Sequence, residues 1–301
     1  MDPKELRSKL KGVIGFPVTP FKKDLSLDLE GLRKNLRMMF KHPLCAVVAA
    51  AGTGEFHSLS PAEHLSVLKV TIEEAAGKLP VLTAVGMNPP IAMEMAKSAA
   101  AAGASGILAF PPYYTTMDDA GVVGYYKSIG DATRLGLLIY SRDWFAASPT
   151  TVEKLAAAIP NLIAWKDGQA DIRRYQMIQQ RLGDRLHWIG GAGDDMVPAY
   201  YSIGVRTYTS SISNTTPKLS IKLHEWASAG HSAEMDKVMN DLIVPLYALR
   251  AKRKGYEVSA MKSMMDMMGL VGGPVRPPLV DLTPEEVEQV RATIPKWQAW
   301  A

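Results

Sequence analysis

A lysine closes one of the most apolar segments of the chain. Lys166 directly follows Leu162–Trp165, a run typical of a buried strand, and a glycine-containing turn comes next. Lysine is rarely buried without a partner, and desolvation lowers the pKa of its amine. A neutral amine that faces a pocket can attack a ketone and form a Schiff base. For a lysine taken alone, a strand end that places its ammonium in water is the commoner explanation.

Further polar groups stand where other predicted strands end. Tyr140 ends one apolar run, and its hydroxyl can carry protons. The turn Gly52-Thr53-Gly54 offers free N–H groups and close backbone approach, which suit a carboxylate. Tyr114 follows two prolines after the fourth predicted strand. Each has a plainer interpretation as a tight turn or a rim residue. Together they are the groups that Schiff-base chemistry on a 2-oxo acid requires.

The remaining candidates follow the predicted strands five, seven and eight. Gly193, Ser210 and Ser211 are candidate substrate-binding residues, the serines for hydroxyls or a second carboxylate. Arg142 has two interpretations that we leave open. It could clamp the second carboxylate, or it could face outward and pair with Asp143.

Short apolar runs alternate with helical patterns over the first 230 residues. Eight nearly continuous apolar runs, each followed by a helix, predict a parallel sheet and favour a (β/α)8 TIM barrel over an open sheet. In such a barrel the chemistry lies at the carboxyl ends of the strands, so all the candidates share one face. The predicted strands are 13–16, 45–51, 80–85, 106–110, 136–140, 162–166, 186–190 and 205–209.

The strand signals stop after the eighth repeat. We therefore predict a barrel domain over residues 1–230 and a C-terminal helical extension over residues 231–301. The predicted helices of this half of the chain are 217–229, 232–252, 258–268 and 284–301, with a glycine- and proline-rich loop at 272–278. The many methionines of the extension indicate adaptable packing in a core or a subunit interface.

Composition excludes several classes of protein. The chain has 301 residues, 47% of them hydrophobic, which is enough for a large core. Its net charge of +4 comes without a basic stripe, so no nucleic-acid partner is expected. No apolar run approaches the ~18 residues of a membrane span, and we expect a cytoplasmic protein. The single cysteine excludes a disulfide framework. Asp194 and Asp195 fit a helix N-cap and a first-turn acid better than a metal pair.

Over essentially its whole length the chain resembles the dihydrodipicolinate synthase and N-acetylneuraminate lyase family of lysine-dependent barrel enzymes. The resemblance implies that Lys166 forms the Schiff base, that Tyr140 shuttles protons and that the turn around Thr53 holds the carboxylate beside the ketone. It also implies a homotetramer in which Tyr114 reaches into a neighbouring subunit's site. The segments that carry it are Gly15–Phe21, Gly52–Glu55, Pro111–Tyr114, Tyr140, Trp165–Asp167 and Gly193–Asp195.

Departures from the synthase pattern narrow the expectation. Gly52 replaces the first of two threonines, and Phe145 stands where the synthases place an arginine, which argues against lysine biosynthesis. The segments Gly52–Phe56, Tyr140–Asp143 and Trp165–Gly168, which include Arg142 and Gly168, are together most similar to the 5-dehydro-4-deoxyglucarate dehydratase branch. That resemblance implies a lyase without metal or organic cofactor that dehydrates and decarboxylates a small sugar acid. The alternatives are a class I aldolase or dehydratase for another 2-keto-3-deoxy sugar acid, and a sugar-acid sensor without activity.

Overall fold

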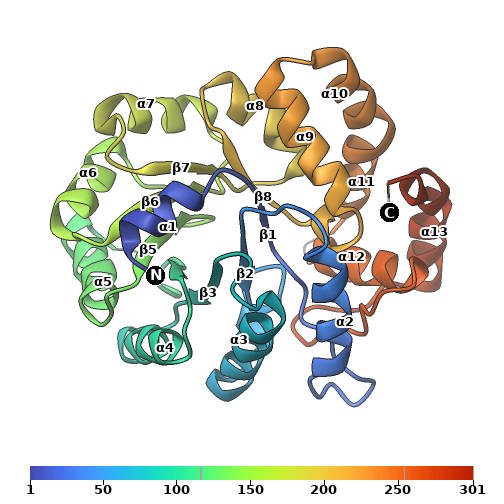
Figure 1. Ribbon diagram of the computed structural model, residues 1–301, viewed down its shortest axis with the longest axis horizontal. Helices are drawn as coiled ribbons and strands as arrows, with labels where there is room; N and C mark the ends of the chain where they lie inside the picture. The colour runs from blue at the N-terminus through green and yellow to red at the C-terminus, as the bar shows by residue number, and fades with distance from the viewer. Residues whose placement is uncertain (116, 254, 301) are drawn as a thin grey trace.

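Eight parallel strands close into a barrel in sequence order (Figure 1). The computed structural model describes residues 1–115, 117–253 and 255–300, so Thr116, Lys254 and Ala301 lie outside the description. The closed parallel sheet confirms the predicted (β/α)8 barrel. The strands are β1 (Gly12–Gly15), β2 (Ala46–Ala49), β3 (Val81–Val85), β4 (Gly106–Ala109), β5 (Gly136–Ser141), β6 (Leu162–Asp167), β7 (His187–Gly190) and β8 (Thr207–Ser210).

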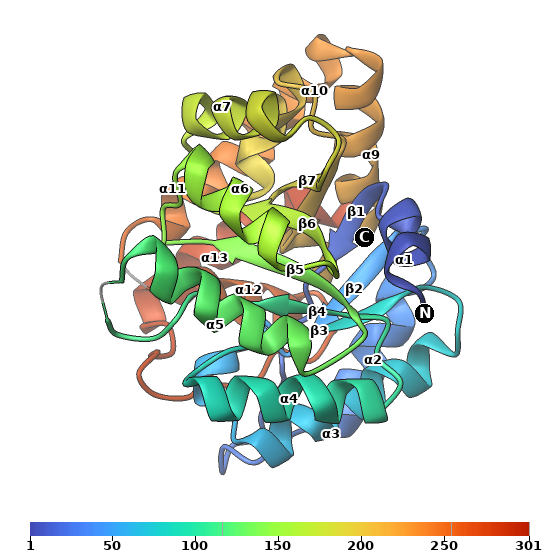
Figure 2. The same cartoon turned by 90° about the vertical axis from the view of Figure 1, so that its left-hand side faces the viewer.

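A ring of helices covers the outside of the strands, and Figure 2 shows α4, α5 and α6 side by side along one flank. Their starts were visible in the sequence: Ser60 and Glu63 form the expected capping box at the head of α3. The helices of the barrel are α2 (Leu29–Met39), α3 (Pro61–Ala75), α4 (Pro89–Ala101), α5 (Asp119–Asp131), α6 (Pro149–Ala158), α7 (Ile172–Leu182), α8 (Val197–Ser202) and α9 (Pro217–Ala229).

An N-terminal helix closes the amino end of the barrel. Helix α1 (Pro3–Lys9) was not predicted, because a single short turn with two leucines carries little periodic signal. Leu6 and Leu10 are fully buried. The Leu6 side chain lies against Gly106 and Gly136, the first residues of β4 and β5. The helix therefore plugs the end of the barrel that is opposite to the predicted chemistry.

The C-terminal extension gathers on one side of the barrel (Figure 1, orange to red). It contains α10 (Ser232–Val238), α11 (Val244–Arg250), α12 (Tyr256–Met267) and α13 (Pro284–Gln298). The segment predicted as one helix over 232–252 is helical over 232–250, but a π-helical turn at Met239–Ile243 separates α10 from α11. Pro245, two residues after this turn, lacks an N–H group, so the regular hydrogen-bond ladder cannot run through this point. No helix within the described ranges is both long and apolar enough to cross a membrane.

Candidate active site

Lys166 and Tyr140 lie side by side on adjacent strands. The two residues are register partners between β6 and β5, so their side chains leave the sheet on the same face. The Lys166 Nζ sits 3.1 Å from the centre of the Tyr140 ring and donates a hydrogen bond to the Gly191 carbonyl at 3.2 Å. Only 3% of Lys166 is exposed. The lysine therefore ends inside the barrel mouth and not in water.

The surroundings of Lys166 favour its neutral amine. Burial lowers the pKa of Lys166 well below the usual value of 10.5, and the positive charge of Arg142 lowers it further. Asp167 acts in the opposite direction. Its carboxylate accepts hydrogen bonds from the Tyr200 hydroxyl at 2.8 Å and from the Ala170 N–H at 3.1 Å, so it stabilises the turn after β6. Burial and Arg142 together thus favour the uncharged form of an amine at a strand end.

Two glycines make room for this pair. A Cβ at Gly191 would lie 2.6 Å from Lys166 Cγ, and a Cβ at Gly168 would lie 2.5 Å from Tyr140 Cε2. Both approaches are far shorter than van der Waals contact. Neither glycine was a predicted site residue, although Gly168 was part of the pattern used for the resemblance. Both glycines are identified in the structure by how closely their backbone approaches the side chain of Lys166 or Tyr140.

Arg142 forms the expected pair with Asp143 and also contacts Tyr140. Its Nη1 donates to the Tyr140 hydroxyl oxygen at 3.0 Å, while its Nε pairs with Asp143 at 3.2 Å. Burial raises the pKa of Tyr140, and the charge of Arg142 opposes that rise. A cavity of about 620 Å³ opens beside this arginine. It is lined by Arg142, Asp143, Trp144, Arg250, Ala251, Arg253, Gly255 and Glu257.

The Gly52-Thr53-Gly54 turn is closed by a hydrogen bond from the Glu55 N–H to the Gly52 carbonyl at 3.1 Å. Thr19 donates to the Gly54 carbonyl at 2.7 Å and supports the turn from the loop after β1. Thr53 is half-buried. A Cβ at Gly52 would meet no atom within 4 Å, so the threonine missing at this position leaves free space at the turn.

A wall of aromatic rings connects this turn with Tyr140. Phe56, at the start of the 3₁₀ turn η1 (Phe56–Ser58), packs against Phe110 with ring centres 4.9 Å apart. Phe110 in turn lies 5.7 Å from the Tyr140 ring, and Phe16 lies 5.3 Å from the Lys166 Nζ. These rings supply the apolar surface that desolvates the lysine. Neither Phe56 nor Phe110 was a predicted site residue. Phe110 was predicted only as the last residue of a strand, and Phe56 lies in a loop, where no periodic pattern marks it.

The residues that follow β7 and β8 form a polar network that differs from the expectation. Asp194 was expected to cap its own helix, but Gly193 occupies that position without a side-chain bond. The Asp194 carboxylate instead accepts hydrogen bonds from the Ser211 N–H at 3.2 Å and from the Tyr247 hydroxyl at 2.9 Å. Arg250 donates to the Ser211 hydroxyl at 2.9 Å. The network joins the barrel mouth to α11, a contact that only the tertiary structure could reveal.

Two predicted site residues, Ser210 and Tyr114, differ from the others in their surroundings. The Ser210 hydroxyl lies 2.8 Å from the Ser220 hydroxyl of α9, so its orientation does not support the predicted role in substrate binding. Tyr114 is 90% exposed and has a φ of 71°, which is uncommon for a residue with a side chain. It stands next to the exposed Tyr113, with ring centres 5.9 Å apart. Its hydroxyl is thus presented to the outside of this subunit.

A model of the "Dihydrodipicolinate synthetase family" matches residues 9–297. The chain belongs to this family. A curated relative from Bradyrhizobium diazoefficiens is 37% identical over 302 residues, which covers 99% of this chain and 96% of that protein. A second, from Ralstonia nicotianae, is 39% identical over 285 residues, which covers 94% and 92%. Both are named "Probable 5-dehydro-4-deoxyglucarate dehydratase".

The fold of this family member also matches solved structures. A dihydrodipicolinate synthase from Oceanobacillus iheyensis aligns with a TM-score of 0.93 at 27% identity and covers 99% of this chain and 100% of that one. The chain is thus a lyase-family enzyme, as the resemblance implied, and the sensor without activity has no support.

Proposed function

We propose that the chain is a Schiff-base lyase that converts 5-dehydro-4-deoxy-D-glucarate into 2,5-dioxopentanoate, water and carbon dioxide. The observation that carries this proposal is the desolvated Lys166 amine, 3.1 Å from the Tyr140 ring at the carboxyl end of the barrel. The names of the curated relatives support the choice of substrate.

The first half of the proposed reaction is a dehydration. We number the carbons from the carboxylate beside the ketone, so that the ketone is C2. The Lys166 amine attacks C2 and, with loss of water, forms an iminium that makes the C3 protons acidic. Loss of a C3 proton gives an enamine, which expels the C4 hydroxyl. Tyr140 is protonated because burial raises its pKa, so it can donate the proton that turns this hydroxyl into water.

The second half is a decarboxylation that uses the same electron sink. Loss of the C4 hydroxyl leaves an iminium conjugated to C4. Electrons of the C5–C6 bond flow into it, and C6 leaves as carbon dioxide. Protonation at C3, ketonisation of the C5 enol and hydrolysis of the iminium then release 2,5-dioxopentanoate and the free amine. The net change is loss of one water and one carbon dioxide, and no step in this scheme needs a redox partner.

The substrate-binding roles follow from this orientation. Thr53 and the N–H groups of the Gly52–Gly54 turn bind the C1 carboxylate, and Ser211 with the backbone at Gly193 contacts the distal hydroxyls. In this orientation the C6 carboxylate approaches Arg142, which also lines the cavity described above. Its existing pair with Asp143 weakens its hold on that carboxylate, which suits a group that must lose its charge to leave.

We further propose that the active form is a homotetramer in which Tyr114 completes the proton relay of a neighbouring subunit. The exposure of the Tyr114 ring supports this role, since a side chain that is 90% exposed in one subunit is accessible to another. Trp144, also exposed, is tied to the same loop through a hydrogen bond from its Nε1 to the Pro112 carbonyl at 2.8 Å. The two loops therefore offer one aromatic surface to a partner subunit.

Borohydride trapping tests the Schiff base directly. Reduction in the presence of substrate should attach the substrate carbon skeleton to Lys166, and Lys166→Ala should lose the adduct and at least about 10⁴-fold in turnover. Lys154→Ala, which removes a surface lysine paired with Asp119, is the matched control and should behave as wild type. An active preparation that yields no adduct contradicts the proposed mechanism.

The products separate the two lyase reactions that this site could perform. Incubation with 5-dehydro-4-deoxyglucarate should release carbon dioxide and the semialdehyde in equal amounts. Release of pyruvate without carbon dioxide would instead identify an aldolase that cleaves C3–C4.

A further inference from the structure

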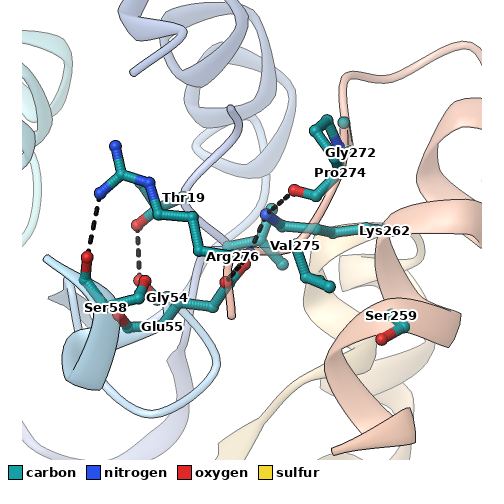
Figure 3. Close-up of polar contacts among 12 residues, drawn as sticks. Thr19, Gly54, Glu55, Ser58, Ser259, Lys262, Gly272, Pro274, Val275 and Arg276 are labelled. Atoms are coloured by element: carbon teal, nitrogen blue, oxygen red, sulfur yellow. Dashed lines mark hydrogen bonds and ion pairs between the residues drawn. The ribbon is translucent and has the colours of Figure 1, made fainter. Parts of the chain in front are cut away.

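A buried ion pair attaches the carboxylate-binding turn to the C-terminal extension (Figure 3). Glu55 directly follows the Gly52–Gly54 turn and has a φ of 56°, in the left-handed region. Its Oε1 lies 2.5 Å from the Nζ of Lys262 in α12. The exposed fractions of the two side chains are 0% and 1%. Neither charge has access to water, so each depends on the other.

The second carboxylate oxygen of Glu55 is also occupied. It accepts a hydrogen bond from the Arg276 N–H at 2.9 Å, across 221 residues of sequence. The Arg276 side chain then reaches back and donates to the Ser58 carbonyl at 3.0 Å (Figure 3). It also donates to the Glu63 carboxylate. The glycine- and proline-rich loop at 272–278 therefore contacts Glu55, the residue that directly follows the turn.

Lys262 is itself held in one position. Its Nζ donates to the Pro274 carbonyl at 2.8 Å and lies 4.3 Å from the centre of the Phe21 ring. Burial lowers the pKa of Lys262, and Glu55 raises it. Buried ion pairs add little net stability compared with apolar packing, but their bonds are directional. The gain from this pair is thus a defined geometry of the turn and not free energy of folding.

We propose that Lys262 is a positioning residue: through Glu55 it sets the orientation of the Gly52–Gly54 N–H groups that receive the C1 carboxylate of the 2-oxo acid. This inference rests on the proposed Schiff-base function. Under it, the helical extension is a working part of the substrate-recognition site. The path from the ion pair to the turn is short. Glu55 is adjacent to Gly54, and its own N–H closes the turn by donating to the Gly52 carbonyl.

Two variants remove the pair in different ways. Lys262→Met leaves the Glu55 carboxylate buried without its counter-charge. Glu55→Gln combined with Lys262→Met removes both charges and keeps an acceptor for the Arg276 N–H, so it remains folded if the single variant does not. The control is Glu286→Gln, which breaks the ion pair with Arg253 inside the extension and keeps the capping box of α13.

The measurement compares two probes by borohydride trapping at Lys166: pyruvate, which has the carboxylate, and hydroxyacetone, which lacks it. We expect wild type and Glu286→Gln to be trapped much faster with pyruvate. In both Lys262 variants the trapping rate with pyruvate should fall about 10-fold or more, which is the effect of losing a hydrogen bond to a charged group. The trapping rate with hydroxyacetone should change less than about twofold. A general structural effect would lower both rates together.

The outcomes separate the two proposals. If wild type forms no adduct with either probe, the Schiff-base function fails and the positioning role falls with it. If wild type prefers pyruvate and both Lys262 variants keep that preference, the positioning role of Lys262 is overturned while the Schiff-base function stands. An equal loss of preference in Glu286→Gln also overturns it, because that pair does not touch the turn.

Discussion

The reactive state of Lys166 depends on two neighbours that act in the same direction. The apolar walls of the barrel mouth withdraw water from the amine, and Arg142 adds a positive charge that disfavours an ammonium. Arg142 also donates to the Tyr140 oxygen at 3.0 Å, so it can stabilise the phenolate that forms when Tyr140 gives up its proton. One half-buried arginine thus acts on both the proposed nucleophile and the proposed proton carrier.

Removing the charge of Arg142 should move the acid limb of the pH profile. The ammonium of Lys166 cannot attack a ketone, so Schiff-base formation rises with pH through the lysine pKa. Arg142→Gln removes a group that lowers this pKa, and the acid limb should therefore shift to higher pH. Arg142→Lys should restore part of the shift. The pH dependence of borohydride trapping measures it, with Arg174→Gln, a surface pair with Asp171, as the control. An unchanged acid limb in Arg142→Gln would contradict the role of this charge.

The chemistry also depends on how closely two strands of the barrel approach each other. β5 and β6 carry Tyr140 and Lys166 as register partners, and the turn after β6 passes under the Tyr140 ring at Gly168. The position of the phenol relative to the amine is thus set by backbone spacing and not by a hydrogen bond between the two side chains.

A methyl group at residue 168 should disturb this spacing. In Gly168→Ala the Cβ would lie 2.5 Å from Tyr140 Cε2, so the ring must move. We expect turnover to fall by about 10²-fold, as for displacements near 1 Å at a reacting centre. Gly124→Ala, a glycine of α5 with open space around its Cβ position, should keep full turnover. Steady-state kinetics with thermal unfolding of each variant provides the measurement. Wild-type turnover in Gly168→Ala would show that the ring position does not matter.

At the scale of the whole molecule, the three residues proposed for the chemistry differ in their exposure. Lys166 and Tyr140 are buried, whereas Tyr114 is 90% exposed. The extension, in contrast, contributes to its own barrel through Lys262 and Arg250. A complete site thus draws on the barrel, the extension and, as we propose, a partner subunit.

Mixing two defective chains should restore activity. Lys166→Ala lacks the amine and Tyr114→Phe lacks the relay hydroxyl, so each homo-oligomer should have low turnover. After dissociation and joint reassembly in a 1:1 ratio, about a quarter of the sites should contain both groups, by the symmetry of a two-fold interface. Activity of the mixture, with oligomeric state followed by light scattering, is the measurement. If the reassembled mixture is no more active than the Tyr114→Phe oligomer alone, Tyr114 is not shared.

The sequence alone determined what depends on local order. The continuous apolar runs between helical patterns predicted all eight strands within a few residues, and the capping box placed the N-cap of α3 at Ser60. Since parallel strands point the same way, the ends of β5 and β6 had to bring Tyr140 and Lys166 to one face. These features depend only on residues that are close in sequence and on the parallel direction of the strands.

Only the tertiary structure decided which way individual side chains turn and which distant segments meet. Ser210 and Ser211 are adjacent in sequence, yet one hydroxyl contacts α9 and the other contacts Arg250. Glu55 is joined to Lys262 and Arg276, which lie more than 200 residues away. Such contacts have no local signal, because their free energy comes from desolvating paired groups that only the folded chain brings together.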